Sequence, residues 1–259
     1  MRNIALAIND ATIGYRNGKS VTPVVTAINA TLCAGEVVAL IGMNGAGKST
    51  LLRTLSAFQP PLSGRVEFEK GDIGQLSSSE LAHCVSVVLT ENNFSTLSVN
   101  EVVSLGRTPY TGFLGRLSDD DKVVVAAAME KMGVRHLAER EYATLSDGEK
   151  QKSMIAKAIA QQTPLMLLDE PTAFLDFRSK VQLFRTLRTL AADFGKAVVV
   201  STHDIEMALR FADKLWLIYD GHLYEGSTRE LAAEGLLQQF IDGDGMVYDK
   251  VNNRIEITR

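Results

Sequence analysis

Alternating and continuous apolar segments divide much of the chain into short expected strands. Residues 4–8 and 27–32 alternate between apolar and polar positions, as half-buried strands do, and turn residues lie between them at 16–19. Residues 37–41 are continuously apolar, which indicates a strand buried on both faces. Further strands are expected at 65–68, 85–89, 165–168 and 197–201, with a hairpin turn at Asp220-Gly221 between 215–218 and 223–225.

Helical signals are concentrated in the middle of the chain. Ser98 and Glu101 have the spacing of a capping box, in which each side chain accepts the backbone N–H of the other residue. Ser118 followed by three aspartates indicates another helix start, because carboxylates are stabilised at the positive end of the helix dipole. Helices are expected over 48–57, from 98, from 118 to Gly133, from Gly148 to before Pro164, up to Gly195, and in a tail from 228 that ends in a strand pair around 252–253.

The order of these segments predicts one α/β domain. Strands that alternate with helices form a parallel sheet flanked by helices, and a helical segment interrupts this order. We expect a core and an N-terminal antiparallel β subdomain over about 1–92 and 163–226, an inserted α-helical subdomain over about 93–162, and a small C-terminal extension at 227–259.

Composition narrows the class of protein. The 259 residues are 46% hydrophobic and 22% charged, which is ordinary for a globular chain. The net charge of −4 offers no basic surface for nucleic acid, and no apolar run reaches the roughly 18 residues of a membrane span. The first ten residues lack the apolar core of a secretion signal, so we expect a cytosolic protein that meets a membrane through a partner. The two cysteines and four histidines show no metal-ligand pattern.

A glycine-rich loop follows the continuously apolar segment at 37–41. It matches the phosphate-binding pattern G-x-x-x-x-G-K-[ST] at every defined position through Gly42, Met43, Asn44, Gly45, Ala46, Gly47, Lys48 and Ser49, with Thr50 next. Glycines let backbone N–H groups converge on phosphates, lysine supplies a cation for the β- and γ-phosphates, and the serine hydroxyl can bind Mg²⁺. The alternative is a glycine-rich turn that precedes Lys-Ser by chance, and the flanking strand and helix disfavour it.

Two acids, Asp169 and Glu170, end the apolar segment 165–168. A carboxylate at such a strand end can hold Mg²⁺ through its water shell, and a second can polarise an attacking water. Buried strands often end in aspartate, so the pair by itself indicates little. The phosphate-binding loop upstream in the same chain favours the catalytic interpretation.

Residues 145–149 read Leu-Ser-Asp-Gly-Glu and resemble the L-S-G-G-Q signature of ABC (ATP-binding cassette) ATPases. By composition alone this is a polar turn that caps a helix. Asp147 replaces the usual middle glycine, and Glu149 replaces the usual glutamine. The added charge of Asp147 either weakens the closure of a nucleotide-bound dimer or points away from the nucleotide, and the sequence leaves both outcomes open.

Other segments match this family in order, and the resemblance covers residues 1 to about 226. Residues 173–176 resemble the D-loop, His203 the switch histidine, and Tyr15 the aromatic residue that stacks on adenine. A histidine after a strand is ordinarily structural and a tyrosine ordinarily belongs to the core; their place in this series favours the site. The resemblance implies an α/β P-loop NTPase fold with a RecA-like core.

The resemblance also implies the site residues, with ATP and Mg²⁺ as cofactors. The implied catalytic residues are Glu170, His203 and Lys48. The implied nucleotide-binding residues are Tyr15, Gly42, Met43, Asn44, Gly45, Ala46, Gly47, Lys48, Ser49, Thr50, Ser146, Gly148, Glu149 and Asp176. The implied metal contacts are Ser49, Asp169 and Glu91. The family's glutamine after the strand at 85–89 is missing, and either Thr90 or Glu91 takes its position.

The helical segment carries a more specific resemblance. Residues 102–110, followed by Gly115 and the acidic helix start, are similar to the arm of importer ATPases for iron chelates, haem and cobalamin. The alternative is a helix that simply ends at Gly106 and Pro109. The resemblance implies an ATP-hydrolysing subunit that powers uptake of a ferric siderophore or related cargo. It works as a homodimer around ATP, bound to transmembrane permease subunits at the cytoplasmic face of the inner membrane, with a substrate-binding protein as an indirect partner and no nucleic acid.

Two other hypotheses about the function remain open from the sequence. One is a soluble ABC ATPase without a membrane partner, and the other is an ATPase subunit of a transporter for a different cargo. Neither differs from the importer subunit in the ATP-binding motifs, because those motifs serve the hydrolysis reaction and not the cargo.

Overall fold

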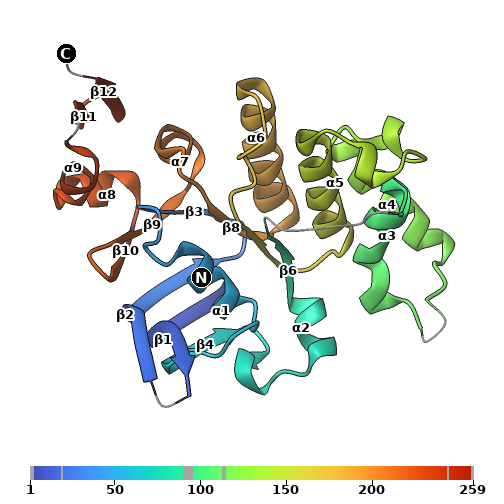
Figure 1. The fold of residues 1–259 in the computed structure, drawn as a ribbon, viewed down its shortest axis with the longest axis horizontal. Helices are drawn as coiled ribbons and strands as arrows, with labels where there is room; N and C mark the ends of the chain where they lie inside the picture. The colour runs from blue at the N-terminus through green and yellow to red at the C-terminus, as the bar shows by residue number, and fades with distance from the viewer. Residues whose placement is uncertain (1–2, 19, 90–95, 113–114, 244, 258–259) are drawn as a thin grey trace.

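A six-stranded sheet forms the centre of the molecule (Figure 1). The computed structural model describes residues 3–18, 20–89, 96–112, 115–243 and 245–257. The strands are β3 (Val37–Gly42), β6 (Val85–Val88), β7 (Leu165–Leu168), β8 (Ala197–Ser201), β9 (Lys214–Tyr219) and β10 (His222–Gly226). Their order is β10-β9-β3-β8-β7-β6, and neighbours are parallel except in the β9–β10 hairpin. The predicted parallel sheet and hairpin are confirmed.

A second, antiparallel sheet is built mainly from the N-terminal segment. Its strands are β1 (Ile4–Asn17), β2 (Ser20–Cys33), β4 (Ser63–Phe68) and β5 (Gly71–Asp72), in the order β2-β1-β4-β5. The first two strands are much longer than the predicted segments 4–8 and 27–32. The β1–β2 register shifts at several points, one of them between Ile8 and Ala11, and each shift breaks the apolar alternation on which the prediction depended.

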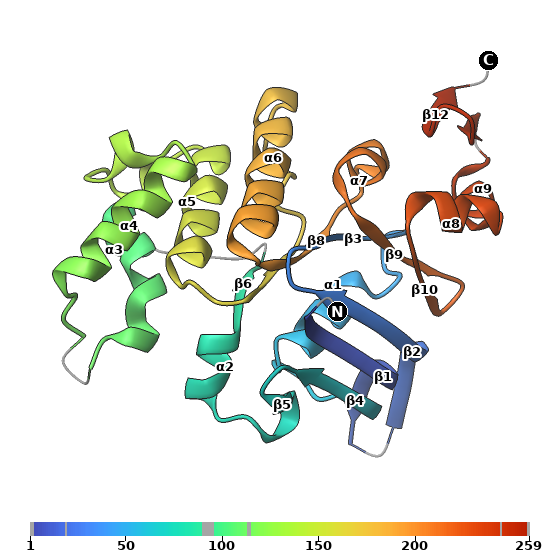
Figure 2. The same cartoon turned by 180° about the vertical axis from the view of Figure 1, so that it is seen from behind.

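Different elements cover the two faces of the central sheet (Figures 1 and 2). The helices of the core are α1 (Lys48–Leu55), α2 (Ser78–Cys84), α6 (Phe177–Phe194) and α7 (Ile205–Phe211). Helix α6 packs Leu183 and Phe184 into the same cluster as Met166 of β7. On the opposite face, α1 and the antiparallel sheet pack against residues such as Trp216 of β9, which is fully buried. Burial on both faces explains why these strands are apolar throughout.

The predicted helical insert is present between β6 and β7. It contains α3 (Val99–Ser104), the 3₁₀ segment η2 (Leu105–Tyr110), α4 (Asp119–Lys131) and α5 (Asp147–Ala160). The capping box expected at Ser98 is formed with Glu101, and the helix start expected at Ser118 is also a capping box, with Asp121. Short 3₁₀ turns η1 (Ile73–Gln75), η3 (Arg135–Leu137) and η4 (Tyr142–Thr144) complete the connections.

A buried arginine ties η2 to two helices of the insert. The Nε of Arg107 donates to Oδ1 of Asp121 at 2.8 Å, and its Nη1 donates to the carbonyl of Ala160 at 2.8 Å. The guanidinium also lies 3.9 Å from the ring centroid of Tyr110. Hydrogen bonds from Ser118 and Arg107 lower the pKa of Asp121 to about 2. The carboxylate therefore stays charged, and the buried cation keeps its partner.

The C-terminal extension packs onto the core. It consists of α8 (Thr228–Ala233), α9 (Leu236–Ile241), β11 (Met246–Asp249) and β12 (Arg254–Ile257), which agrees with the predicted small helices and strand pair. Leu231 and Leu237 share a buried cluster with Leu215 of β9. In the part of the chain that the structure describes, no helix combines the length and apolarity needed to cross a bilayer. The domain boundaries near 92, 163 and 227 stay a prediction.

The sequence left open that a helix ends at Gly106 and Pro109, and the structure shows that no helix ends at Gly106. Helix α3 ends at Ser104, and Gly106 lies inside η2 against the last turns of α5. A Cβ at this position would meet the carbonyl oxygen of Lys157 at 2.3 Å, so glycine is required by close approach of two backbones.

We therefore expect Gly106→Ala to push η2 away from α5 and to lower the free energy of unfolding by about 2 kcal/mol. Urea unfolding monitored by circular dichroism measures this loss. Gly112→Ala is the matched control, because a Cβ at Gly112 meets no atom within 4 Å. Equal free energies of unfolding for the two variants would show that η2 can move away from α5 without a loss of stability.

Candidate functional site

The glycine-rich loop lies at the carboxyl end of β3 and leads directly into α1. Gly45 and Gly47 have φ angles of 78° and 112°, values that L side chains rarely adopt. A Cβ on Gly47 would in addition meet Cγ1 of Val24 at 2.7 Å. Side chains are therefore disfavoured at these two positions, and α1 begins at the end of the loop with Gly47 as the N-cap residue. The loop therefore fits a phosphate chain held by backbone N–H groups and a helix N-terminus.

The ammonium group of Lys48 curls back over this loop. Its Nζ donates to the carbonyl oxygen of Gly42 at 2.8 Å and to that of Met43 at 3.2 Å. The side chain is buried, so its charge lies over the loop and not in bulk solvent. The structure thus places the predicted lysine where it can contact phosphates, with Ser49 next to it at the start of α1.

Tyr15 is attached to the loop helix by its hydroxyl. The phenol oxygen and the Thr50 hydroxyl are 2.9 Å apart, and 49% of the tyrosine is exposed. A half-exposed ring beside the phosphate loop is available for stacking on a base, whereas a core tyrosine would be covered. The structure therefore brings Tyr15 to the loop, and its role as the adenine contact stays a prediction.

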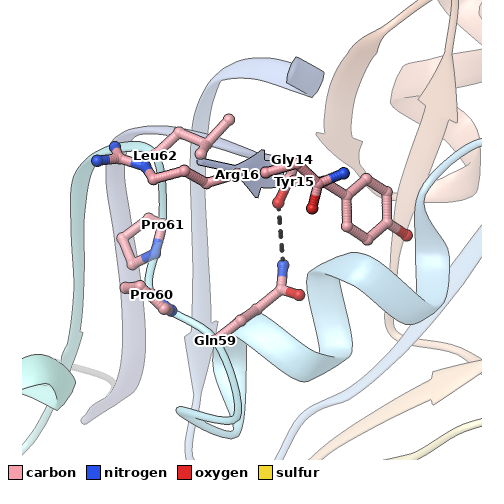
Figure 3. Close-up of a pocket in the computed structure, with 8 residues that line it drawn as sticks. Gly14, Tyr15, Arg16, Gln59, Pro60, Pro61 and Leu62 are labelled. Atoms are coloured by element: carbon pink, nitrogen blue, oxygen red, sulfur yellow. Dashed lines mark hydrogen bonds between the residues drawn. The ribbon is translucent and has the colours of Figure 1, made fainter. Parts of the chain in front are cut away.

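A pocket of about 510 Å³ adjoins Tyr15 on the side away from α1 (Figure 3). Gln59 Nε2 donates across its floor to the carbonyl of Gly14 at 3.4 Å. In Figure 3 the ring of Tyr15 turns toward α1, and the side chain of Arg16 extends in the opposite direction. The sequence did not predict this pocket, because its walls come from β1 and from the loop after α1, residues 59–62.

The two acids of the site lie at the end of β7. Asp169 is buried, and its Oδ1 accepts a hydrogen bond of 2.5 Å from the Ser201 hydroxyl. Its backbone N–H donates to the carbonyl of Val88 at the end of β6. The carboxylate is therefore fixed at the same sheet edge as the phosphate loop, as a magnesium ligand or a contact to its water shell requires.

Glu170 is held against the predicted switch histidine. Its Oε2 lies 2.7 Å from Nδ1 of His203, and the His203 side chain is largely exposed. Glu170 has a φ of 47°, a left-handed conformation that costs a non-glycine residue roughly 1 kcal/mol. Its backbone N–H donates to the Ser201 hydroxyl at 2.8 Å. The prediction that Glu170 and His203 act together is consistent with this geometry.

Ser201 is the residue of this group that sequence reasoning missed. It is the last residue of β8 and fully buried, and it contacts both acids. The feature of the sequence that could have identified it is a serine directly after three valines, 198–200, on the strand next to β7. That pattern also fits a strand that merely approaches solvent, so it did not identify a site by itself.

The signature segment opens α5 through a capping box, as at α3 and α4 of the insert. The Ser146 backbone N–H and its hydroxyl both donate to Oε2 of Glu149 at 2.8 Å, and the Glu149 N–H donates back to Ser146. These bonds lower the pKa of Glu149. Glutamate at the position of the family's glutamine therefore serves as a helix cap, and its substitution is explained locally.

Asp147, the second departure from the signature, faces solvent. Its side chain is 68% exposed and lies 3.8 Å from the ammonium of Lys150. An exposed charge beside an opposite charge is well screened. Asp147 lines the same open pocket as Ser146 and Gly148, so the two outcomes that the sequence left open both stay predictions.

The D-loop lies directly beside the signature segment. The two segments line one open pocket of about 430 Å³, whose lining includes Ser146, Gly148 and Asp176. Asp176 caps α6 by accepting the N–H of Ser179 at 2.7 Å, and this bond lowers its pKa. The predicted nucleotide contacts thus fall into two groups, one at the phosphate loop and one at the N-terminus of α5. In the described residues, no hydrogen bond joins the two groups.

The predicted metal contacts are Ser49, Asp169 and Glu91. Thr90 and Glu91 lie outside the described residues, so the position of the missing glutamine stays a prediction. Across residues 3–18, 20–89, 96–112, 115–243 and 245–257, no three acids, histidines or cysteines form a metal cage. Mg²⁺ in phosphoryl transfer is ordinarily held by one or two protein ligands together with substrate phosphates, and Ser49 and Asp169 fit that arrangement.

A glycine-rich loop between a parallel strand and a helix N-terminus, with two acids at the same sheet edge, is the arrangement of a P-loop NTPase. The chain belongs to the ABC transporter family, whose pattern matches residues 25–173, more than half of its length. It is the ATPase domain of that family, with ATP as its nucleotide. The predicted fold class and enzyme class are therefore confirmed.

Several relatives extend over most of this chain. An uncharacterised ABC transporter ATP-binding protein of Methanocaldococcus jannaschii is 42% identical over 82% of this chain and 72% of its own length. A hemin import ATP-binding protein of Streptomyces coelicolor is 40% identical over 85% of this chain and 78% of its own. An iron(3+)-hydroxamate import ATP-binding protein of Bacillus subtilis is 33% identical over 91% and 89%.

Solved structures show the same fold. A dimeric bacterial ABC transporter cassette is 27% identical, with a TM-score of 0.77 over 86% of this chain and 98% of that chain. The same cassette in a post-hydrolysis state, bound to ADP and Pi, matches with a TM-score of 0.76 over the same shares. Both structures are dimeric, and the post-hydrolysis structure contains ADP and Pi.

We expect Tyr15→Ala to weaken ATP binding about tenfold, because stacking of a base on an aromatic ring contributes roughly 1–3 kcal/mol. Titration with a fluorescent ATP analogue measures the affinity. Tyr15→Phe is the matched control: it keeps the ring and removes the hydroxyl contact with Thr50. Equal weakening by both changes would mean that the hydroxyl, and not the ring, carries the contact.

Proposed function

We propose that this chain is the ATP-hydrolysing subunit of an importer for an iron chelate, or for the related cargoes haem and cobalamin. The observation that carries the enzymatic part is the contact of 2.7 Å between Glu170 and His203 at the sheet edge that also holds Lys48 and Asp169. The relatives named for hemin and iron(3+)-hydroxamate import support the cargo class.

Each side chain then has one task. Lys48 and the N–H groups of its loop bind the phosphates. Ser49 and Asp169 would hold Mg²⁺, which would supply positive charge beside the phosphate oxygens. Glu170 orients the attacking water and accepts its proton, and His203 fixes the Glu170 carboxylate through Nδ1. Phosphoryl transfer depends mainly on position and charge, so residues held by hydrogen bonds suffice.

The site is completed by a second copy of the chain. The signature group, Ser146 and Gly148, lies at the N-terminus of α5 and is separate from the phosphate loop of its own protomer. A head-to-tail homodimer would bring this group onto the nucleotide bound by the partner, and the dimeric cassettes with the same fold support that arrangement. Hydrolysis then occurs only after closure, which transmits force to the permease subunits.

The place of action follows from this proposal. The chain would bind transmembrane permease subunits at the cytoplasmic face of the inner membrane, as a peripheral protein, and a substrate-binding protein would deliver the cargo to the permease. The helical insert supports the importer class, because 102–110 forms the end of α3 and the turn η2, which Arg107 ties to α4 and α5. A soluble ABC ATPase or a transporter for another cargo remains the alternative for the test below.

We expect Glu170→Gln to bind ATP as tightly as the wild-type chain and to lose turnover by about 100-fold or more, because the base is removed and the fold is kept. Steady-state phosphate release and size analysis in ATP and Mg²⁺ measure both effects, and the variant should accumulate as a dimer. Glu139→Gln, an exposed glutamate of the insert, is the control and should hydrolyse normally. Full activity of Glu170→Gln would remove this residue from the mechanism.

For the cargo, we expect cells that lack this chain to lose uptake of one labelled compound among a ferric siderophore, haem and cobalamin. The wild-type chain should restore uptake and Glu170→Gln should not, since closure without hydrolysis gives no transport cycle. Normal uptake of all three compounds in the deletion strain would contradict the proposed cargo and favour a soluble role or another substrate.

A further inference from the structure

The hydroxyl of Ser201 touches both strand-end acids. It donates to Oδ1 of Asp169 at 2.5 Å and accepts the backbone N–H of Glu170 at 2.8 Å. One hydroxyl has one proton to donate and lone pairs to accept, so both bonds form together. Ser201 is fully buried, so bulk solvent does not reach this hydroxyl.

Sheet geometry places the serine at this point. Strands β7 and β8 are parallel, and Leu168 pairs with Val200, so the next positions along the two strands are Asp169 and Ser201. Two residues further along the chain is His203. The hydroxyl therefore lies between the acid expected to hold Mg²⁺ and the acid that contacts the switch histidine.

The two bonds have different consequences. The bond to Oδ1 fixes the rotation of the Asp169 carboxylate, while Oδ2 accepts no hydrogen bond from the described residues and stays available to the metal and its water. The bond from the Glu170 N–H supports the left-handed φ of 47°, and that conformation directs the Glu170 side chain to Nδ1 of His203. Removal of the hydroxyl would release both acids at once.

We propose that Ser201 is a positioning residue that aligns the magnesium-binding Asp169 with the catalytic Glu170. This inference rests on the proposed ATPase function. It adds a residue that acts through its hydrogen bonds to the two acids.

The test compares variants that differ in the hydroxyl. Ser201→Ala removes it, and Ser201→Thr keeps it on a residue suited to a strand. Ser201→Val has almost the same shape as the threonine variant without a hydroxyl, so the comparison of Thr with Val remains valid if alanine unfolds the protein. Ser86→Ala is the matched control, because Ser86 is equally buried on β6 and its hydroxyl reaches only the carbonyl of Leu165, at 3.5 Å.

We expect Ser201→Ala and Ser201→Val to lower kcat about tenfold with KM for ATP within about twofold of the wild type. Ser201→Thr should restore most of the kcat, and Ser86→Ala should leave it unchanged. Wild-type turnover in the alanine and valine variants would overturn the proposal. So would an equal loss of turnover in Ser86→Ala, or a threonine variant as slow as the valine variant.

A second readout does not depend on turnover. The affinity for the fluorescent analogue mant-ATP is measured with Mg²⁺ and with EDTA, and the ratio reports how much the metal strengthens binding. We expect the Mg²⁺ concentration for half-maximal strengthening to rise about tenfold in Ser201→Ala and Ser201→Val and to stay near the wild-type value in Ser201→Thr. A half-maximal Mg²⁺ concentration that is the same in all variants and the wild type would refute the role of Ser201. A wild-type chain that binds no mant-ATP would instead refute the proposed function.

Discussion

The parallel register of three neighbouring strands is the constraint on which the site depends. Strands β3, β8 and β7 are adjacent and run in the same direction, so their carboxyl ends meet at one edge of the sheet. The phosphate loop follows the first, His203 the second, and Asp169 with Glu170 the third. Residues separated by more than 120 positions in the chain thereby become neighbours. If β7 were shifted by one position in this register, the side chains of the two acids would point in other directions.

Local strain at this edge is balanced by hydrogen bonds. Glu170 takes a left-handed conformation that is unfavourable for a side chain with a Cβ, and its N–H is bonded to Ser201 while its carboxylate meets His203. Strain of this kind persists when the surroundings over-determine it, as they do between two buried strands. The catalytic carboxylate is therefore held in place by its neighbours and not by its own backbone preference.

In the helical insert, residues that cap a helix also belong to the signature segment. The same capping-box chemistry opens α3, α4 and α5, and at α5 the two participating residues, Ser146 and Glu149, belong to the signature segment. Glutamate satisfies the cap while glutamine is the usual family residue, so the local helix start tolerates this change. The exposed side chain of Asp147 lies one residue into the same helix, directed to solvent.

The sequence by itself determined the buried strands, most helix starts and the individual motifs, because continuous apolar runs, capping boxes and a glycine-rich loop are local signals. It underestimated β1 and β2, whose bulges break the alternation, and it did not identify Ser201. Only the tertiary structure decided that Gly106 meets Lys157, that Arg107 joins three elements, and that one serine touches both acids. Those contacts depend on which strands and helices become neighbours, and the register and packing that decide this are long-range properties that no local pattern encodes.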